Sequence, residues 1–260
     1  MPFQNKDGLR FYTFDIFQDT PLVHAVFTRI GGVSPFPWAE LNLGSTVGDA
    51  PERVAENRRR AFQNIGRPIE SLFDVWQVHS ADVICTYEPR PIHAQHRKAD
   101  GILTDSPQVT LFMRFADCVP ILLYDPVRNV VGLVHAGWQG TVKRTVIAAV
   151  RALNDHYGSV PENILAGIGP SIGSHHYPVG GEVVERVEDE FGVAARGFLH
   201  NHTGEVQFDL WEANRWLLQQ VGVKQVEIAG ICTACHPEDW YSHRGEDGKT
   251  GRFGVLIGLI

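Results

Sequence analysis

The chain has 260 residues, of which 43% are hydrophobic and 20% are charged, and its formal net charge at pH 7 is −7. This composition is typical of a globular protein that buries a sizeable core. The thinly spread basic residues exclude the dense basic stripe that a nucleic-acid-binding surface needs. They are compatible with a small anionic substrate, because a few local arginines suffice to bind such a molecule.

The N-terminal segment MPFQNKDGLRFYTF has neither the basic start nor the apolar run of a secretory signal. The longest apolar stretch, Val130–Val134, is far too short to cross a bilayer. Four cysteines in a chain of this length do not make a disulfide scaffold. We therefore expect a cytoplasmic protein with reduced thiols and with neither a membrane nor a nucleic-acid partner, while the sequence leaves the oligomeric state open.

The N-terminal quarter of the chain predicts two strands, a long loop and a helix. Apolar runs over residues 9–17 and 22–28 favour strands. The segment that follows, up to residue 49, is rich in Gly, Pro and Ser, and a long stretch without periodicity is either flexible or functional. Asp49 is a fair N-cap for a helix, with Glu52 three positions further on.

The rest of the chain mixes short strands with a few helices. Apolar and β-branched runs predict strands over residues 71–78, 82–87, 109–115, 119–124, 130–134, 164–168, 226–231 and 254–260. Helical spacing predicts helices over residues 141–153, 181–191 and 210–221. Some strand pairs are too close in the chain for a helical crossover. We therefore expect one α/β (α+β) domain over residues 1–260, with mixed β-sheets flanked by helices.

Three residues that can bind a metal follow predicted strands. His79 and His135 come directly after such runs, Cys118 follows another by a few residues, and side chains at the ends of neighbouring strands can converge. Two imidazoles and a thiolate suit zinc and also copper, and three protein ligands leave a fourth position for water or substrate. The spacing is equally compatible with unrelated core and loop residues. Asp117 and Asp82 are candidates for partners of the ligands or for acid–base groups, or else for turn caps.

Three further groups of His and Cys residues have weaker interpretations. The Cys232–Cys235 pair, followed by His236, has the spacing of half a structural zinc site, but the sequence contains no second CxxC. We interpret it as a local structural or incidental pair. The pairs His175–His176 and His200–His202 lie in polar, Gly-rich surroundings, which favours solvated loops.

Arginines beside glycines mark candidate anion sites, and nearby aromatic residues offer flat faces for a base. In the segment TRIGGVS, Arg29 precedes a glycine turn that lets backbone N–H groups approach an anion, although a plain turn is the alternative. Near the C-terminus, Arg244 and Arg252 also neighbour glycines. Core packing is the alternative to base stacking for each of the candidate aromatic residues, Trp138, Trp240 and Tyr241.

Ordered motifs along nearly the whole chain resemble one family. They are TRIGGVS (28–34), LNLG (41–44), GD with the following NRRR (48–60), QVHSADV (77–83), ADGILTD (99–105), ADCVPILLYD (116–125), VHAGWQGT (134–141), GIGPSIG (167–173) and SHRGEDGKTGR (242–252). On these segments the chain resembles the YfiH-type proteins, formerly called multicopper polyphenol oxidoreductases or laccase-domain proteins.

The resemblance implies a zinc-dependent purine nucleoside phosphorylase with an accompanying adenosine deaminase activity. The substrates would be adenosine, inosine, guanosine and methylthioadenosine, together with phosphate. The family pattern assigns zinc, or else copper, to His79, Cys118 and His135. It suggests catalytic roles for Asp117, Asp82 and Arg29, with Arg29 also holding phosphate. The remaining substrate-binding candidates within the matching motifs are Ser34, Asn42, Trp138, Arg244 and Arg252.

The sequence also departs from the family pattern. Members commonly have His in place of Thr46 and Arg in place of Gln139, and the segment around Arg244 lacks one arginine. Fewer positive charges make hydrolysis or deamination an alternative main activity, unless Arg114 substitutes. Three other functions stay open: a copper-dependent polyphenol oxidase, a peptidoglycan-precursor editing hydrolase with Cys118 as nucleophile, and a metal-binding protein without enzymatic activity.

Overall fold

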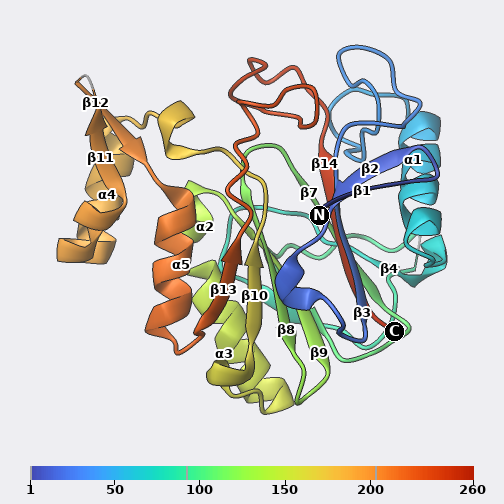
Figure 1. The fold of residues 1–260 in the computed structure, drawn as a ribbon, viewed down its shortest axis with the longest axis horizontal. Coiled ribbons are helices and arrows are strands. Elements are labelled where there is room, and N and C mark those ends of the chain that lie inside the picture. The colour runs from blue at the N-terminus through green and yellow to red at the C-terminus, as the bar shows by residue number, and fades with distance from the viewer. Residues whose placement is uncertain (1, 92, 203) are drawn as a thin grey trace.

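Two six-stranded sheets form the centre of the protein in the computed structural model, which describes residues 2–91, 93–202 and 204–260 (Figure 1). The first sheet is antiparallel except for its β7–β4 edge, which is parallel. Its strands, in spatial order, are β1 (Phe3–Lys6), β2 (Leu9–Tyr12), β3 (Leu22–Phe27), β14 (Phe253–Leu259), β7 (Thr110–Phe115) and β4 (Leu72–Phe73).

The second sheet has an antiparallel centre and a parallel pair at each edge. Its strands, in spatial order, are β13 (Gln225–Ile228), β10 (Leu165–Ile168), β8 (Val119–Asp125), β9 (Val130–Ala136), β6 (Gly101–Thr104) and β5 (Val83–Cys85). A separate hairpin of β11 (Leu199–His202) and β12 (Glu205–Phe208) extends away from both sheets (Figure 1).

Helices cover the outer face of each sheet (Figure 1). The α-helices are α1 (Pro51–Asn64), α2 (Trp138–Val142), α3 (Thr145–Tyr157), α4 (Gly181–Phe191) and α5 (Leu210–Gln220). The 3₁₀ turns are η1 (Asp15–Phe17), η2 (Ile69–Ser71), η3 (Pro161–Asn163), η4 (Ser174–His176) and η5 (Gly192–Gly197). Helix α1 lies against the first sheet, and α2, α3 and α5 lie on the side of the second.

Alternating side chains of the central strands build three hydrophobic layers. In β8, Leu122 and Tyr124 pack between the two sheets, whereas Ile121 and Leu123 pack against the helices outside. In β14, Leu256 faces α1 and its neighbours face the other sheet. Because the central strands are buried on both faces, their sequences are almost continuously apolar. The expected domain with mixed sheets flanked by helices is therefore confirmed.

The helix predicted over residues 141–153 is two helices in the structure. The chain breaks between α2 and α3 at Arg144, whose φ of 58° is left-handed and interrupts the helical path. Helix α1 begins at Pro51, and Ala50 occupies the N-cap without a side-chain hydrogen bond. The Asp49 carboxylate instead accepts the N–H of Ala50 and pairs with Arg53, so the N-cap expectation was wrong by one residue.

Two local expectations on strands also need correction. Of the strand predicted over residues 71–78, only β4 is regular, and the chain then leaves the sheet toward the loop that carries His79. His200 and His202 lie in exposed strand β11 rather than in a loop. The regular strands that form here are only two residues long in β4 and four in β11, and periodicity over so few residues carries little information on secondary structure.

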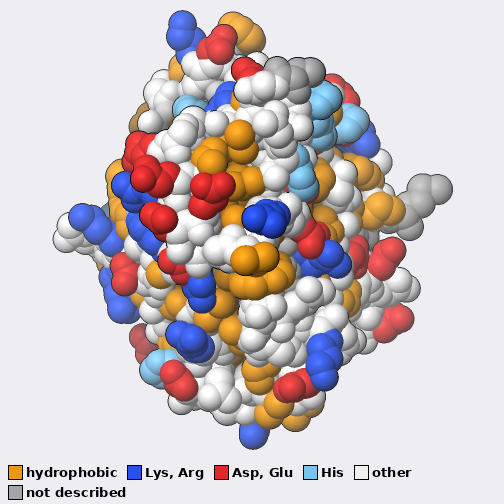
Figure 2. All heavy atoms as spheres, turned by 90° about the vertical axis from the view of Figure 1, so that its left-hand side faces the viewer, with side chains coloured by type: hydrophobic (Ala, Val, Ile, Leu, Met, Phe, Trp, Pro, Cys, Tyr) orange, Lys and Arg blue, Asp and Glu red, His pale blue; other side chains and the backbone are white. Residues whose placement is uncertain are grey.

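The surface over α4 and α5 carries interspersed acidic and basic side chains among its described residues (Figure 2). Within the described chain, none of the helices combines the length and the apolar character that crossing a bilayer requires.

Candidate active site

His79, Cys118 and His135 meet at one point, although they lie far apart in the sequence. Their potential ligand atoms all lie within 4.8 Å of one another, and the Cys118 Sγ is 3.8 Å from the Nε2 of His79. For a tetrahedral zinc ion with its usual bond lengths, neighbouring ligand atoms are separated by about 3.3 to 3.8 Å. The three side chains could therefore hold such an ion with small adjustments. We name them the three-ligand cluster.

The sheet register brings two of these residues together. Cys118 directly precedes β8, and His135 is the penultimate residue of the neighbouring antiparallel strand β9, where it pairs with Pro120. The turn before Cys118 contains Asp117 with a φ of 81°, and His79 itself has a φ of 57° in the loop after β4. Non-glycine residues seldom adopt such conformations, and they concentrate at functional sites.

Gly137 leaves the space into which the cluster fits. A Cβ atom at this position would lie 2.8 Å from the Cys118 Sγ and 3.2 Å from the Cδ2 of His79. The first distance is too short for a carbon and a sulfur atom that are not bonded. Glycine in the HAGW motif is therefore explained by close approach rather than by backbone conformation, since its φ is an ordinary −72°.

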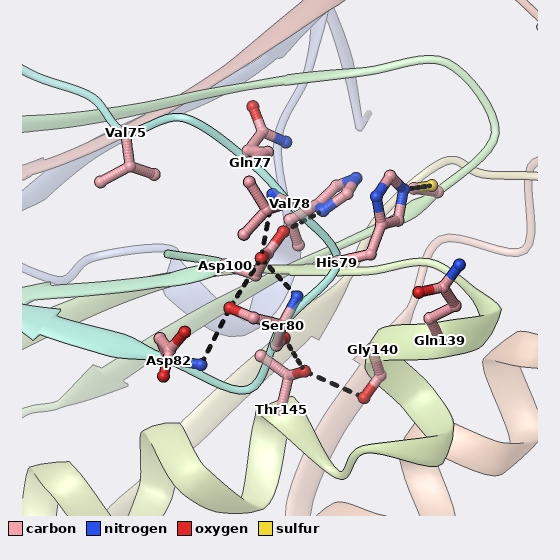
Figure 3. A network of polar contacts seen from close by, with 12 residues as sticks. Val75, Gln77, Val78, His79, Ser80, Asp82, Asp100, Gln139, Gly140 and Thr145 are labelled. Atoms are coloured by element: carbon pink, nitrogen blue, oxygen red, sulfur yellow. Dashed lines mark hydrogen bonds and ion pairs between the residues drawn. The ribbon is translucent and has the colours of Figure 1, made fainter. Parts of the chain in front are cut away.

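Asp100 fixes the orientation of His135. Its Oδ1 lies 2.8 Å from the His135 Nδ1, and its Oδ2 accepts the N–H groups of Ser80 at 2.6 Å and Val78 at 3.1 Å (Figure 3). Burial alone would raise the pKa of Asp100, but these hydrogen bonds, with that of His135 foremost, lower it to about 2. An ionised carboxylate only accepts, so Nδ1 carries the proton and Nε2 is free to bind a metal.

The charges around Cys118 favour its thiolate. Burial by itself would raise the pKa of this thiol, but the imidazoles of His135 and His79 outweigh that effect and hold the pKa below its ordinary value. The thiolate is both the form that binds metals and the form that acts as a nucleophile.

A cavity of about 400 Å³ opens beside the three-ligand cluster. This volume lies within the range of pockets that bind small organic molecules. In addition to the cluster, its walls consist of Gly44, Ser45, Thr46, Trp76, Gln77, Arg114, Ala116, His243 and Arg252. The walls therefore combine an aromatic ring with cationic side chains.

Positive charge accumulates behind one wall of the cavity. The Asp74 carboxylate, which is fully buried, pairs with Arg90 at 2.6 Å and with Arg114 at 3.2 Å, and it lies 3.1 Å from His96. Burial would raise the pKa of Asp74, but His96 and the two arginines hold it well below its usual range. One carboxylate faces two guanidinium groups, so this wall carries a net positive charge that suits an anion.

The structure places Arg29 away from this cavity. Its guanidinium pairs with Glu246 at 3.1 Å, donates to the Ala39 and Pro237 carbonyl oxygens and lies over the Tyr241 ring. Arg29 therefore connects the loop after β3 to the C-terminal loop. No described contact joins it to the three-ligand cluster.

Ser34 and Asn42 are buried supports of the same loop region. The Ser34 hydroxyl donates to the Asp49 carboxylate at 2.5 Å. The Asn42 Nδ2 donates to the Asp49 carboxylate and to the Gly44 carbonyl oxygen, and its Oδ1 accepts the N–H groups of Gly44 and Arg252. Their contribution to the cavity is indirect, because the turn they hold supplies Gly44 to the wall.

The two candidate aspartates do not face the cavity. Both oxygens of Asp117 are engaged, one by the Thr233 hydroxyl at 2.7 Å and one by the Arg244 N–H at 2.6 Å. Asp82 is exposed, and its carbonyl oxygen accepts the N–H groups of Asp100 and Gly101. The carboxylate that does contact the His135 ring is that of Asp100, which the sequence alone did not single out.

Among the remaining candidates, Arg252 alone is part of the described cavity wall. The Trp138 ring lies beneath the Arg186 guanidinium. The Arg244 guanidinium lies over the Tyr177 ring, and its Nη1 donates a hydrogen bond to the Pro178 carbonyl oxygen. Trp240 and Tyr241 are fully buried and cannot stack on a substrate. The aromatic residue in the wall is Trp76, which is 48% exposed.

Comparison with known proteins agrees with this architecture. A family model described as multi-copper polyphenol oxidoreductase laccase matches residues 23–260. The chain belongs to this family. Relatives of the chain include the purine nucleoside phosphorylase YlmD of Bacillus subtilis, which is 37% identical over 242 residues, covering 89% of this chain and 86% of the relative.

Two other relatives extend the same pattern. The purine nucleoside phosphorylase YfiH of Escherichia coli is 36% identical over 236 residues, covering 90% of this chain and 92% of the relative. The crystal structure of YlmD from Geobacillus stearothermophilus matches the fold of this chain with a TM-score of 0.91 at 33% sequence identity. The match covers 99% of this chain and 98% of the YlmD chain. The resemblance seen in the sequence motifs is thereby confirmed at the level of the family and the fold.

Proposed function

We propose that this protein is a metal-dependent purine nucleoside phosphorylase. The observation that carries the proposal is a nucleoside-sized cavity with three metal-binding side chains at one side and a cationic wall at another. The names of the relatives from Bacillus subtilis and Escherichia coli support the same assignment. In the reaction a phosphate oxygen bonds to the ribose anomeric carbon, the bond from that carbon to the purine nitrogen breaks, and the base leaves with the electron pair.

His79, Cys118 and His135 would hold the metal, which we propose to be zinc. Three protein ligands leave one position for a substrate atom. When bound, the ion supplies a Lewis acid that polarises an oxygen of the substrate. Asp100 keeps the His135 ring in the required tautomer and orientation.

The cationic wall would bind phosphate. Arg114 and Arg252 both line the cavity, and His243 lines it as well. Arg29, the residue that the family pattern suggests for phosphate, is not among the residues that line the described cavity. Its guanidinium pairs with Glu246 and donates to backbone carbonyl oxygens elsewhere. Trp76, with its exposed indole in the wall, would stack on the purine.

The preferred substrates would be adenosine, inosine, guanosine and methylthioadenosine, with deamination of adenosine as an accompanying reaction. Purified, zinc-replete protein is incubated with inosine or adenosine, with and without phosphate. Release of hypoxanthine or adenine together with ribose 1-phosphate, only when phosphate is present, is the expected result. Conversion of adenosine to inosine without phosphate would establish the deaminase reaction. Failure to release any base, with either nucleoside, would contradict the proposal.

The Cys118 environment favours one second candidate, a hydrolase that uses this thiolate as nucleophile on peptidoglycan precursors. Two imidazoles near a thiol of lowered pKa are the arrangement of a cysteine hydrolase as well as that of a metal site. The two functions differ in how zinc affects the thiol. If zinc-replete protein is alkylated by iodoacetamide at Cys118 as fast as metal-free protein, the nucleophile assignment is favoured. Protection by zinc favours the metal assignment.

A further inference from the structure

A second cluster of metal-binding side chains lies outside the cavity. His175 and His176 from η4 meet Cys232 and Cys235 from the loop after β13, and their potential ligand atoms all lie within 4.8 Å of one another. The His175 Nε2 is 3.1 Å from the Cys235 Sγ, and the His176 Nδ1 is 3.5 Å from the Cys232 Sγ and 3.4 Å from the Cys235 Sγ. We name these four residues the four-ligand cluster.

The geometry of the four-ligand cluster is close to that required around a tetrahedral ion. Zinc–sulfur and zinc–nitrogen bonds of their usual lengths place neighbouring ligand atoms about 3.3 to 3.8 Å apart. The three sulfur–nitrogen separations lie between 3.1 and 3.5 Å. Both cysteines are free thiols rather than a disulfide. Two thiolates with two imidazoles form one of the common ligand sets of structural zinc.

The backbone around the four-ligand cluster is arranged to support it. Ser171 and Cys232 form a parallel bridge, which fixes the two segments side by side. The Gly173 N–H donates to the Cys232 Sγ at 3.2 Å, a contact that stabilises a thiolate. A Cβ at Gly173 would lie 2.6 Å from the His175 ring and 3.3 Å from the Cys232 Cβ, so a side chain here would displace the ligands.

We propose that His175, His176, Cys232 and Cys235 bind one structural zinc ion. All four tetrahedral positions would be filled by the protein, which leaves no place for a substrate. The ion would crosslink two segments that are nearly 60 residues apart in the chain. A metal held by a folded site and not by the unfolded chain adds its binding free energy to the stability of the fold.

The crosslink would also support the turn that carries Cys118. Ile172 donates its N–H to the Asp117 carbonyl oxygen, and the Thr233 hydroxyl donates to the Asp117 carboxylate. Thr233 directly follows Cys232, Ile172 lies three residues before His175, and Asp117 directly precedes Cys118 in the chain. The proposed zinc therefore stabilises the active-site turn without taking part in chemistry.

The first test counts metal. Wild-type protein purified with zinc and dialysed is expected to hold about two zinc ions per chain by elemental analysis, given one ion per complete ligand set. The variants Cys232→Ser/Cys235→Ser and His175→Asn are each expected to hold about one ion per chain and to unfold at a lower temperature. Cys85→Ser and His200→Asn, which change a Cys and a His outside both clusters, are the matched controls and should retain the wild-type zinc content. Unchanged zinc content in the double Cys variant would overturn the proposal.

The second test remains valid where a ligand variant fails to fold. In Cys118→Ser, the three-ligand cluster has no thiolate, so thiolate-to-cobalt charge transfer after loading with Co²⁺ must come from elsewhere. We expect intense ultraviolet charge-transfer bands together with the strong visible bands of tetrahedral cobalt. Absence of these bands would overturn the proposal. A disulfide between Cys232 and Cys235, detected by peptide mass spectrometry in protein purified under reducing conditions, would overturn it as well. Neither result depends on nucleoside turnover, so the proposed function is tested separately.

Discussion

The molecule contains two groups of His and Cys residues that differ in ligand number and in access. The three-ligand cluster lies at the wall of a cavity, and its His135 is only 4% exposed. In the four-ligand cluster three of the side chains, including both histidines, are exposed and none lines that cavity. An open coordination position beside a cavity permits chemistry, whereas four protein ligands at the surface permit crosslinking. On the proposed assignments, the same residue types would serve different purposes according to what surrounds them.

The two clusters also differ in what orients their ligands. Asp100, a carboxylate of depressed pKa, holds the His135 ring in the three-ligand cluster. In the four-ligand cluster a backbone N–H, that of Gly173, supports a sulfur. A carboxylate raises the basicity of its imidazole and tunes the metal, while a backbone amide chiefly fixes position. This contrast predicts that substitutions near the first cluster affect turnover and those near the second affect stability.

Loss of one thiol from each cluster should give the largest contrast. Cys118→Ala is expected to reduce kcat/KM for phosphorolysis of inosine by about a thousandfold or more, because the Lewis acid contributes several kcal/mol. Cys232→Ala should change kcat/KM by less than about tenfold while lowering the unfolding temperature more. Steady-state kinetics and thermal unfolding on the same preparations measure both effects. Equal losses of activity in the two variants would contradict the division of roles.

A methyl group added at each of the two close-approach glycines should sharpen the contrast. Gly137→Ala places a carbon 2.8 Å from the Sγ of the half-buried Cys118, so we expect kcat/KM to fall by about a hundredfold, as a misplaced active-site group can do. In Gly173→Ala the nearest atom belongs to the exposed His175 ring, which can move aside. Turnover should then change little and zinc content should fall. A larger loss of turnover in Gly173→Ala than in Gly137→Ala would contradict the proposed division of roles.

Removal of the charge on Asp100 should have a somewhat smaller effect. Asp100→Asn preserves the shape of the side chain but withdraws the carboxylate from the His135 Nδ1. Such partners of metal-binding histidines typically contribute 10- to 100-fold to metal affinity or activity. Zinc affinity, measured by competition with a chromophoric chelator, should fall by a factor of about this size. Asp105→Asn, an exposed aspartate just after β6, is the control and should bind zinc as the wild type does.

The sequence predicts the central strands better than it predicts the sites. Strands β8, β9 and β14 are buried on both faces, so their apolar runs are long and unambiguous. The break at Arg144 has no such signal, because the apolar spacing of α3 continues without interruption from that of α2. The convergence of Cys118 and His135 depends on the antiparallel register of β8 and β9, which residue spacing alone does not determine.

Distance along the chain explains what was missed at the two clusters. Asp100 lies 35 residues from His135 and reaches it only through the pairing of β6 with β9. The pairs His175–His176 and Cys232–Cys235 are each too short to indicate a metal site, and no spacing rule joins an adjacent His pair to a distant CxxC. Their meeting depends on the bridge between Ser171 and Cys232. Both ligand sets are therefore assembled by tertiary contacts between segments that are far apart in the chain.

The most direct test of the two-cluster account is a crystal structure of the zinc-replete protein with anomalous differences measured on both sides of the zinc absorption edge. We expect one peak among His79, Cys118 and His135 with an additional ligand from solvent or substrate on the cavity side. We expect a second peak enclosed by His175, His176, Cys232 and Cys235 alone. A fully loaded crystal without density at the first position, or with a fourth protein ligand closing it, would contradict the account.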